Sequence, residues 1–285
     1  MIASETLDYK PKSAITASIC LQDLDGRSCN SALQYTGKST QFGEGMEILL
    51  ILFVVVVASG VGTMTGFGAS TIMVPLVLLF YSVPQTLFFV GIIHFFGNVW
   101  KLVLFHKGLN WRLILSFGIP GIAATYLGAS LVFSIPAAML SRILGSFLII
   151  YVIYLFVESS FKIRPNLVFG ACGGALSGFL AGIFGIGGAV RSLFLTTFDL
   201  PKAVYIVTGG AIAICIDATR LTTYFKNGAK LPTMLLYGLP LFIAASFLGA
   251  AIAKRIVDRI PQQHFRKIIA VFLFMMGIKL LLMPE

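Results

Sequence analysis

Charged side chains are scarce in this sequence, since Asp, Glu, Lys and Arg together make up 11% of its 285 residues. Soluble domains carry about 25% charged residues, so this chain has too few to cover a water-exposed surface. Hydrophobic residues make up 58% of the chain, and the mean hydropathy is +0.94. These values exclude an ordinary soluble domain and predict an integral membrane protein. We expect it in a plasma or inner membrane.

Cysteine is also scarce, with four residues in all. None belongs to a CxxC pair or a His/Cys cluster, so we predict no metal site and no cofactor. Cys20 and Cys29 can pair if their segment faces an oxidising space. Cys172 and Cys215 lie within apolar runs, where we expect them to pack as small hydrophobic residues. The common ATP-binding loop, Gly-x-x-x-x-Gly-Lys-Ser/Thr, is missing as well.

The formal net charge of +10 does not indicate nucleic-acid binding. The basic residues fall in short segments between apolar runs, as in 226–230 and 254–267. Lys and Arg are expected at such places from the positive-inside rule and from anionic lipid headgroups. We therefore expect membrane lipids as partners, and segment 254–267 on the cytoplasmic side.

Residues 1–45 are polar and lack the long apolar core of a signal peptide, so we expect a mostly flexible tail. Apolar runs follow one another from residue 46 onward. They are continuous rather than alternating, which predicts helices and an all-α polytopic membrane protein. The expected spans are Met46–Gly62, Thr71–Tyr81, Pro84–Phe105, Trp111–Phe133, Pro136–Val157, Asn166–Phe184, Ala189–Phe198, Pro201–Phe225, Leu231–Ala253 and Gln262–Met283.

Two glycine-rich stretches interrupt these runs, "GFGAST" from Gly66 and "GIGGAVRSLFL" from Gly185. The apolar pieces that follow them, Thr71–Tyr81 and Ala189–Phe198, are too short to cross about 30 Å of hydrocarbon alone. The glycines therefore predict broken or re-entrant helices.

The two stretches lie 119 residues apart, and further similarities follow in the same order. Several ordered similarities indicate a duplication, and predict a first membrane repeat at 46–158 and a second at 165–285. The paired positions are Gly66 with Gly185, Gly68 with Gly187, Pro84 with Pro201, Val90 with Val207, Gly108 with Gly228, Pro120 with Pro240, and Gly128 with Gly249.

Each repeat contains five apolar pieces. If the short pieces cross with help from neighbours, each repeat has an odd number of crossings and the two are inverted, which we favour. If the short pieces are re-entrant, each repeat has four crossings and the two are parallel. Inverted repeats with broken helices commonly meet at a central binding site in transporters.

Backbone groups at a broken helix cannot be satisfied by lipid and must face protein or a water-filled cavity. The start of a half-helix attracts anions, and glycine lets a ligand approach the backbone. We therefore predict substrate contacts from both stretches. The alternative is that the glycines only allow close helix packing. The candidate positions are Gly66, Gly68, Ala69, Ser70, Gly185, Gly187 and Gly188.

Charged residues inside the apolar runs are further candidates. Arg191 lies in the second short piece, where a guanidinium suits an oxyanion if it faces a cavity; the alternative is that it snorkels to a headgroup. Asp217 and Arg220 are three residues apart, which predicts an ion pair on one helix face. That pair can be structural, or it can place Arg220 on the transport pathway with Asp217 holding it or relaying protons.

The corresponding segment of the first repeat carries His94, Asn98 and Lys101 at i, i+4 and i+7. This spacing places all three on one helix face, which predicts contact with a cavity or another helix. His94 can couple transport to protons, or it can be a hydrogen-bonded packing residue. The alternative for Lys101 is that it snorkels, since it lies near a helix end.

At these residues the chain resembles the sulfite exporter TauE/SafE family. The resemblance rests on "GFGASTIMVPL", "GIFGIGGAV" and "FHKGLNW" and covers about residues 46–283. It implies duplicated helical halves around a central site, and transport of small sulfur-containing anions such as sulfite or organosulfonates. The sequence departs from the family pattern at Ala69 and Ser70, where glycines are usual, at Phe194 opposite Pro75, and at Arg191.

We therefore expect a secondary transporter that moves a small anion by alternating access. Both a proton and Na⁺ are candidate coupling ions, and a homo-oligomer is a candidate assembly. An anion channel is an alternative, because channels also line a pathway with polar groups. An intramembrane enzyme is disfavoured, since Ser177 has no identifiable partner base and His264 lies in a basic segment.

Overall fold

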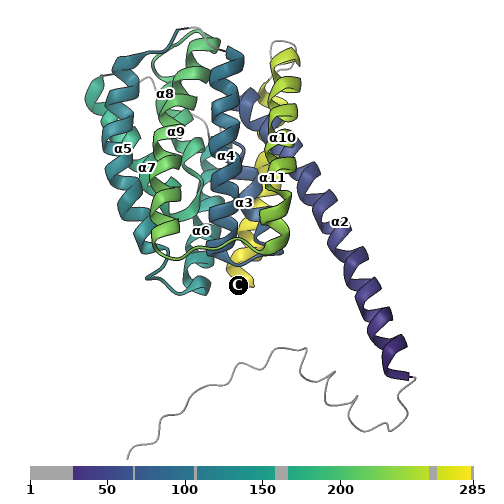
Figure 1. The fold of residues 1–285 in the computed structure, drawn as a ribbon. Coiled ribbons are helices and arrows are strands. Elements are labelled where there is room, and N and C mark those ends of the chain that lie inside the picture. Colours follow the sequence, from purple (N-terminus) through teal and green to yellow (C-terminus); the bar gives the residue numbers. More distant parts are fainter. Residues whose placement is uncertain (1–27, 67, 106–107, 158–165, 257–261, 284–285) are drawn as a thin grey trace, which may run out of the picture. The chain divides into compact units, whose positions relative to one another are not determined.

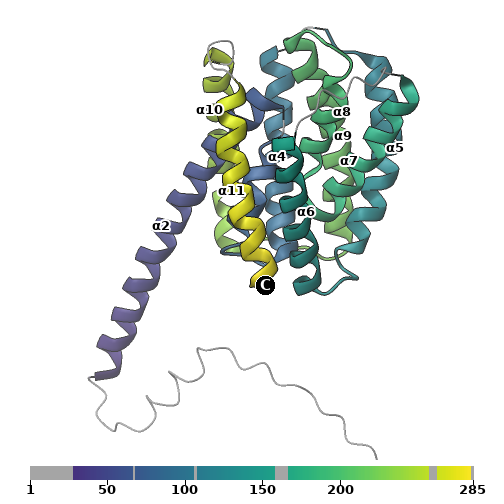
Figure 2. The same ribbon diagram turned by 180° about the vertical axis from the view of Figure 1, so that it is seen from behind.

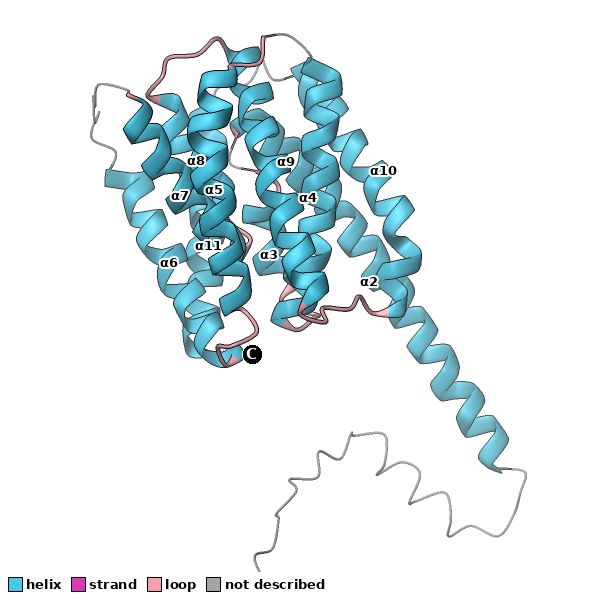
Figure 3. Cartoon of the chain, turned by 60° about the vertical axis from the view of Figure 1, so that its left-hand side comes forward, coloured by secondary structure: helices cyan, strands magenta, loops and turns pink. Residues whose placement is uncertain are grey.

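The computed structural model describes residues 28–66, 68–105, 108–157, 166–256 and 262–283. Within these ranges every regular element is a helix (Figure 3). The prediction of an all-α protein is confirmed. The predictions for Cys20 and for the side chains of Cys29 and His264 fall outside the residues or side chains described.

Ten helices follow one another along the described chain (Figure 1). In the predicted first repeat they are α2 (Ser28–Thr65), α3 (Ser70–Val77), α4 (Val83–Phe105), α5 (Trp111–Leu131) and α6 (Ala137–Val157). In the predicted second repeat they are α7 (Leu167–Phe184), α8 (Gly187–Thr196), α9 (Lys202–Lys226), α10 (Thr233–Ile256) and α11 (Gln262–Leu282).

The helix starts have local causes. The side chains of Asn110 and Asn166 accept hydrogen bonds from the amides of Leu113 and Phe169, at 3.2 and 2.7 Å, and so cap α5 and α7. Proline stands at or directly before the first residues of α4, α6, α9 and α10. It is tolerated there because the first helical amides have no intrahelical partner.

The N-terminal segment differs from its expected form. Helix α2 begins at Ser28 rather than near Met46, so the backbone of 28–45 is helical where a flexible tail was expected. The polar residues of this stretch do not favour a helix strongly. The helix extends backward without a break from the apolar run, since adding a residue to an existing helix costs less than starting one.

Six helical stretches are long and apolar enough to cross a membrane among the described residues. They are Gly45–Met64, Val83–Phe105, Trp111–Leu131, Leu167–Phe184, Lys202–Lys226 and Thr233–Ile256. Helices α6 and α11 add shorter apolar segments, Ala137–Ile153 and Leu273–Leu282. Large apolar side chains such as Leu115, Ile119 and Ile150 are exposed on the helix surfaces, where lipid would cover them. The chain is an integral membrane protein.

Glycine brings α5 and α7 into backbone contact. A Cβ atom added at Gly174 would overlap the carbonyl of Phe117, and one added at Gly178 would overlap that of Gly121. The Oγ1 atom of Thr125 donates a hydrogen bond to the carbonyl of Gly178 at 3.0 Å. Residue numbers rise together along this contact, so the two helices run parallel. Small residues permit this close approach in membranes, where packing rather than hydrophobicity holds helices together.

Helices α4 and α9 cross in opposite directions and lie side by side at the centre of Figure 1. A Cβ added at Gly91 would lie 2.8 Å from Leu221, and one added at Gly210 would lie 3.0 Å from Leu102. Helices α6 and α11 are adjacent in Figure 2. A Cβ added at Gly145 of α6 would lie 2.7 Å from the carbonyl of Gly277 of α11. Antiparallel contact between corresponding helices is what inverted repeats require. The duplication itself stays a prediction.

The register of that correspondence differs from the expected one in α4 and α9. Gly91 and Gly210 make mirrored contacts and are 210 − 91 = 119 residues apart. The sequence comparison paired Val90 with Val207, which gives 207 − 90 = 117. The pairing of Val90 with Val207 rests on aligning Pro84 with Pro201. Proline is tolerated both before a helix and in its first turn, so it does not determine which residues of the two helices correspond.

Both short helices follow a turn at the glycine stretches. Gly185 ends α7 in the left-handed conformation, at φ +72°, and its amide donates to the carbonyl of Ala181. Helix α8 then runs back along α7, because Gly187 packs on Ser177 and Phe194 packs on Gly173. After α2, Gly66 and Gly68 also have positive φ, at +76° and +83°. Helices α3 and α8 contact each other.

Candidate functional site

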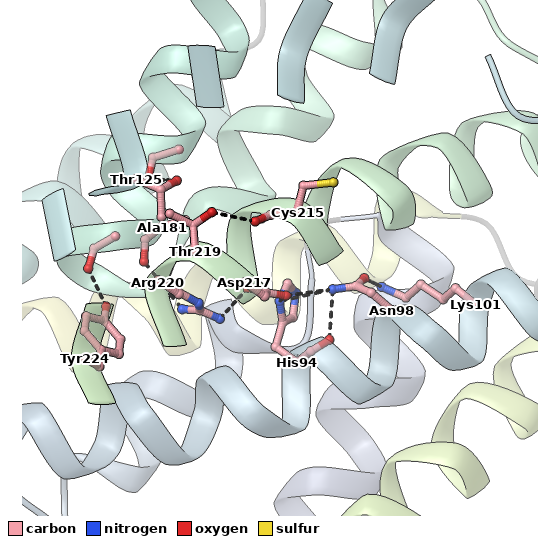
Figure 4. A network of polar contacts seen from close by, with 12 residues as sticks. His94, Asn98, Lys101, Thr125, Ala181, Cys215, Asp217, Thr219, Arg220 and Tyr224 are labelled. Carbon is pink, nitrogen blue, oxygen red and sulfur yellow. Dashed lines mark hydrogen bonds and ion pairs between the residues drawn. The ribbon is translucent and has the colours of Figure 1, made fainter. Parts of the chain in front are cut away.

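A chain of polar side chains joins α4 to α9 inside the apolar fold (Figure 4). His94, Asn98 and Lys101 come from one face of α4, and Asp217 and Arg220 come from α9. All five side chains are buried. The structure thus brings together two faces that the sequence indicated separately.

The contacts along this chain are direct. His94 Nδ1 lies 2.7 Å from Oδ2 of Asp217. Asn98 Nδ2 donates to the same carboxylate oxygen at 3.2 Å, and Lys101 Nζ donates to Asn98 Oδ1 at 3.1 Å. A carboxylate that accepts several hydrogen bonds can stay ionised when buried. Asp217 is therefore the centre of the network.

Arg220 forms the ion pair that its spacing predicted. Its Nη2 atom lies 2.8 Å from Oδ1 of Asp217. Its Nη1 atom donates to the carbonyl of Ala181 at 3.4 Å, and the Tyr224 hydroxyl donates to the carbonyl of Gly182. Both carbonyls belong to the last turn of α7, where carbonyls lack some of their intrahelical donors; that of Ala181 also accepts from the Gly185 amide. Arg220 therefore helps to hold the end of the broken helix.

A small cavity of about 10 Å³ lies beside this network, with room for about one water molecule. Its walls come from the end of α2, the segment after it, and helices α4, α8 and α9. The lining residues are Gly62, Thr63, Gly66, Asn98, Lys101, Arg191, Ser192, Leu195, Tyr205, Ile206, Gly209 and Gly210. No carboxylate is among them.

Two buried basic side chains, Arg191 and Lys101, line the cavity. Arg191 is 4% exposed and Lys101 is 7% exposed. Among the described residues, the side chain of Arg191 makes no hydrogen bond or ion pair. The side chain of Lys101 donates a hydrogen bond to the uncharged Asn98. The buried Asp217 is already paired with Arg220. Buried charges without a partner are costly, so an anion between Lys101 and Arg191 would stabilise the site.

The glycine stretches contribute unequally. Gly66, at φ +76°, lines the cavity, and a Cβ added there would lie 2.5 Å from the Tyr205 hydroxyl. Gly68 lies against Nε2 of His94, a nitrogen that has no hydrogen-bond partner among the described residues. Gly187 packs against α7. Gly68, Ala69, Ser70, Gly185, Gly187 and Gly188 are absent from the cavity lining.

Of the predicted site residues, Gly66, Asn98 and Arg191 therefore reach the cavity, whereas His94, Asp217 and Arg220 stand in the adjacent network. The alternative that Lys101 snorkels does not hold, because its side chain is buried and its Nζ atom donates to Asn98. The helix face that Lys101 shares with Asn98 predicts its buried position, whereas its place near a helix end does not. Thr63, Ser192 and Tyr205 also line the cavity, and no sequence signal distinguished them.

Ser177 is the hydroxyl that the sequence offered as a possible nucleophile. Ser177 is buried where α7 packs on α8, and its hydroxyl donates to the carbonyl of Gly174 at 3.2 Å. No base contacts this hydroxyl among the described residues. Over the same residues, no group of three or more His, Cys, Asp or Glu side chains could hold a metal ion.

Fold and cavity together define a polytopic α-helical membrane protein with a buried cationic cavity. The family model "Sulfite exporter TauE/SafE" matches residues 51–280, and the chain belongs to this family. It is also similar to a protein of Methanocaldococcus jannaschii described as a probable membrane transporter protein. The two are 26% identical over 270 residues, which cover 83% of this chain and 97% of that protein. The chain is thus a membrane transporter of the TauE/SafE family.

Proposed function

We propose that the protein is a secondary transporter that moves a small anion across the membrane by alternating access. Sulfite is the substrate we favour, with organosulfonates and other sulfur-containing anions as alternatives. The observation that carries this proposal is the pair of buried cations, Lys101 and Arg191, at a cavity lined by no carboxylate. Guanidinium and ammonium groups are suited to oxyanions. The family description points in the same direction.

Alternating access requires the cavity to change size. The cavity of about 10 Å³ has room for about one water molecule. A sulfite ion is larger than a water molecule and does not fit in it. The segments that would move are α3 and α8, which follow turns rather than continuing the preceding helices. Gly66, which precedes α3, and Arg191, which belongs to α8, both line the cavity. Movement of α3 and α8 would therefore change its shape.

An anion channel is the second candidate. A channel needs a continuous polar pathway when open, whereas the cavity here is small and buried between helices. Measurements in planar bilayers separate the two candidates. A transporter gives slow saturable flux without unitary currents, and single-channel conductance would favour the alternative.

The proposed coupling site for a proton is the pair of His94 and Asp217, which adjoins the cavity through Asn98. Na⁺ is the alternative coupling ion. Proteoliposomes with an imposed pH gradient or an imposed Na⁺ gradient distinguish them, because only the coupled ion drives uptake against an anion gradient.

A binding screen tests the proposed substrate class. Purified protein is heated with sulfite, sulfate, thiosulfate, taurine or sulfoacetate, and its melting temperature is measured. A bound ligand at about 100 times its dissociation constant stabilises a protein by about 2.7 kcal/mol, so the substrate should raise the melting temperature in proportion to the logarithm of its concentration. If no anion in this panel does so and none is transported into proteoliposomes, the proposed function is wrong.

A further inference from the structure

The crossing of α4 and α9 is internally symmetric. Gly91 of α4 lies against Leu221 of α9, and Gly210 of α9 lies against Leu102 of α4. Gly91 and Gly210 are 119 residues apart, as are Leu102 and Leu221. The same spacing separates Gly66 from Gly185, so one correspondence relates the two breaks and the two crossing helices.

This correspondence pairs the polar residues of the two helices. Asn98 corresponds to Asp217, and Lys101 corresponds to Arg220, because each pair is 119 residues apart. In α9 the carboxylate of Asp217 neutralises Arg220 at 2.8 Å. In α4 the amide of Asn98 accepts a hydrogen bond from Lys101 at 3.1 Å but carries no charge. Of these two cations, Lys101 is the one without an ion-pair partner among the described residues.

The backbone beside these pairs is also equivalent. Gly62 and Thr63, which line the cavity, correspond to Ala181 and Gly182. In the second half, Arg220 and Tyr224 donate hydrogen bonds to the carbonyls of Ala181 and Gly182. The side chains of Arg220 and Tyr224 thus occupy the position in the second half that corresponds to the cavity in the first half.

The two places differ in whether their cation is paired. A Cβ added at Gly66 would meet the hydroxyl of Tyr205. A Cβ added at Gly185 would instead lie 3.1 Å from Nη1 of Arg220, 3.1 Å from Val74 and 3.2 Å from Leu87. That guanidinium is already paired with Asp217 at 2.8 Å, so the second place lacks a free cation.

We infer that the chain holds one anion site, between Lys101 and Arg191, and that Asn98 determines the charge of this site. At the equivalent position in the other half, Asp217 neutralises Arg220. This inference rests on the proposed function. Asn98 is a specificity-determining residue here: a neutral side chain at this position leaves the Lys101 charge available to a substrate.

The test replaces Asn98 with aspartate and measures binding of labelled sulfite by equilibrium dialysis. If another anion of the panel stabilises the protein more, that anion is used instead. The Asn98→Asp variant should pair Lys101 as Asp217 pairs Arg220, and weaken anion binding at least about tenfold. The matched control, Asn98→Ala, removes the same hydrogen bonds without adding charge and should weaken binding less. Equal losses in both variants, or no loss in Asn98→Asp, would overturn the role of Asn98.

Because Asn98 also donates to Asp217, Asn98→Asp can lose stability. The number of anions bound to the unaltered protein is therefore measured beside it. One anion per chain at saturation is expected, with binding in Lys101→Met weakened at least about tenfold. Two anions per chain, or half the capacity left in Lys101→Met, would contradict a single site. A complete absence of binding by the unaltered protein counts against the proposed function instead.

Discussion

The side chains of His94 and Asp217 meet 2.7 Å apart, although they are 123 positions apart in the chain and belong to different predicted repeats. This contact joins α4 to α9 at the centre of the fold. It also connects the ion pair that holds the end of α7 with the cavity that contains Lys101, through Asn98. A change on one side of the crossing can thus reach the other through two hydrogen bonds.

Replacing Lys101 with methionine should weaken anion transport while the protein stays folded. Methionine keeps the approximate length of the side chain and removes the charge that faces the cavity. We expect the Michaelis constant for sulfite uptake into proteoliposomes to rise at least about tenfold, the change that corresponds to ~1.4 kcal/mol. Lys226→Met, at an exposed lysine of α9, is the matched control and should transport normally.

The two buried arginines should respond differently to removal of their charge. Arg220→Met leaves Asp217 without its ion-pair partner, which typically costs about 3–5 kcal/mol. Arg191→Met removes a buried cation that has no ion pair among the described residues, so stability in anion-free buffer should not fall. Thermal unfolding of both variants checks this contrast. A larger loss in Arg191→Met than in Arg220→Met would show that the assignment is reversed.

Much of the fold could be predicted from the pattern of apolar runs. Long apolar runs locate α5 and α9 to within about two residues, because in lipid the backbone of a spanning segment must be helical. The breaks at Gly66 and Gly185 were visible because a short apolar piece cannot cross alone. The all-α membrane fold follows from these features, without any knowledge of tertiary contacts.

The sequence indicates the site only in part. Helical spacing places His94, Asn98 and Lys101 on one face but does not say what that face meets. The ion pair of Asp217 with Arg220 was predicted from local spacing, whereas the contacts of Arg220 with α7 depend on how distant helices pack. For that reason the sequence could not separate a cavity-lining arginine from one that supports a helix end.

Gly178→Ala should destabilise the protein, because a Cβ there would overlap the backbone of Gly121 in the α5–α7 contact. Overpacking of this kind costs about 1–3 kcal/mol. Gly118→Ala is the control on α5, since a Cβ at Gly118 would have no atom within 4 Å, and alanine favours a helix over glycine. Melting temperatures in detergent should fall for Gly178→Ala alone. Equal melting temperatures would mean that the two helices can separate freely.

Tyr224→Phe removes one hydroxyl group and should leave the carbonyl of Gly182 without that donor. An unsatisfied buried polar group costs about 1–3 kcal/mol. We expect a lower melting temperature with little change in the affinity for sulfite, because Tyr224 is not among the cavity-lining residues. Tyr237→Phe, at a tyrosine that is 81% exposed, should leave both quantities unchanged. A loss of affinity in Tyr224→Phe that exceeds the loss in Lys101→Met would move the anion site toward α7.

The position of a bound anion tests the central claim most directly. Selenite has the shape of sulfite and scatters X-rays anomalously, so a crystal of the protein with selenite locates the ion. One anomalous peak per chain is predicted, between Nζ of Lys101 and the guanidinium of Arg191 and within about 4 Å of both. A peak beside Arg220 and the end of α7, with none between Lys101 and Arg191, would contradict the account.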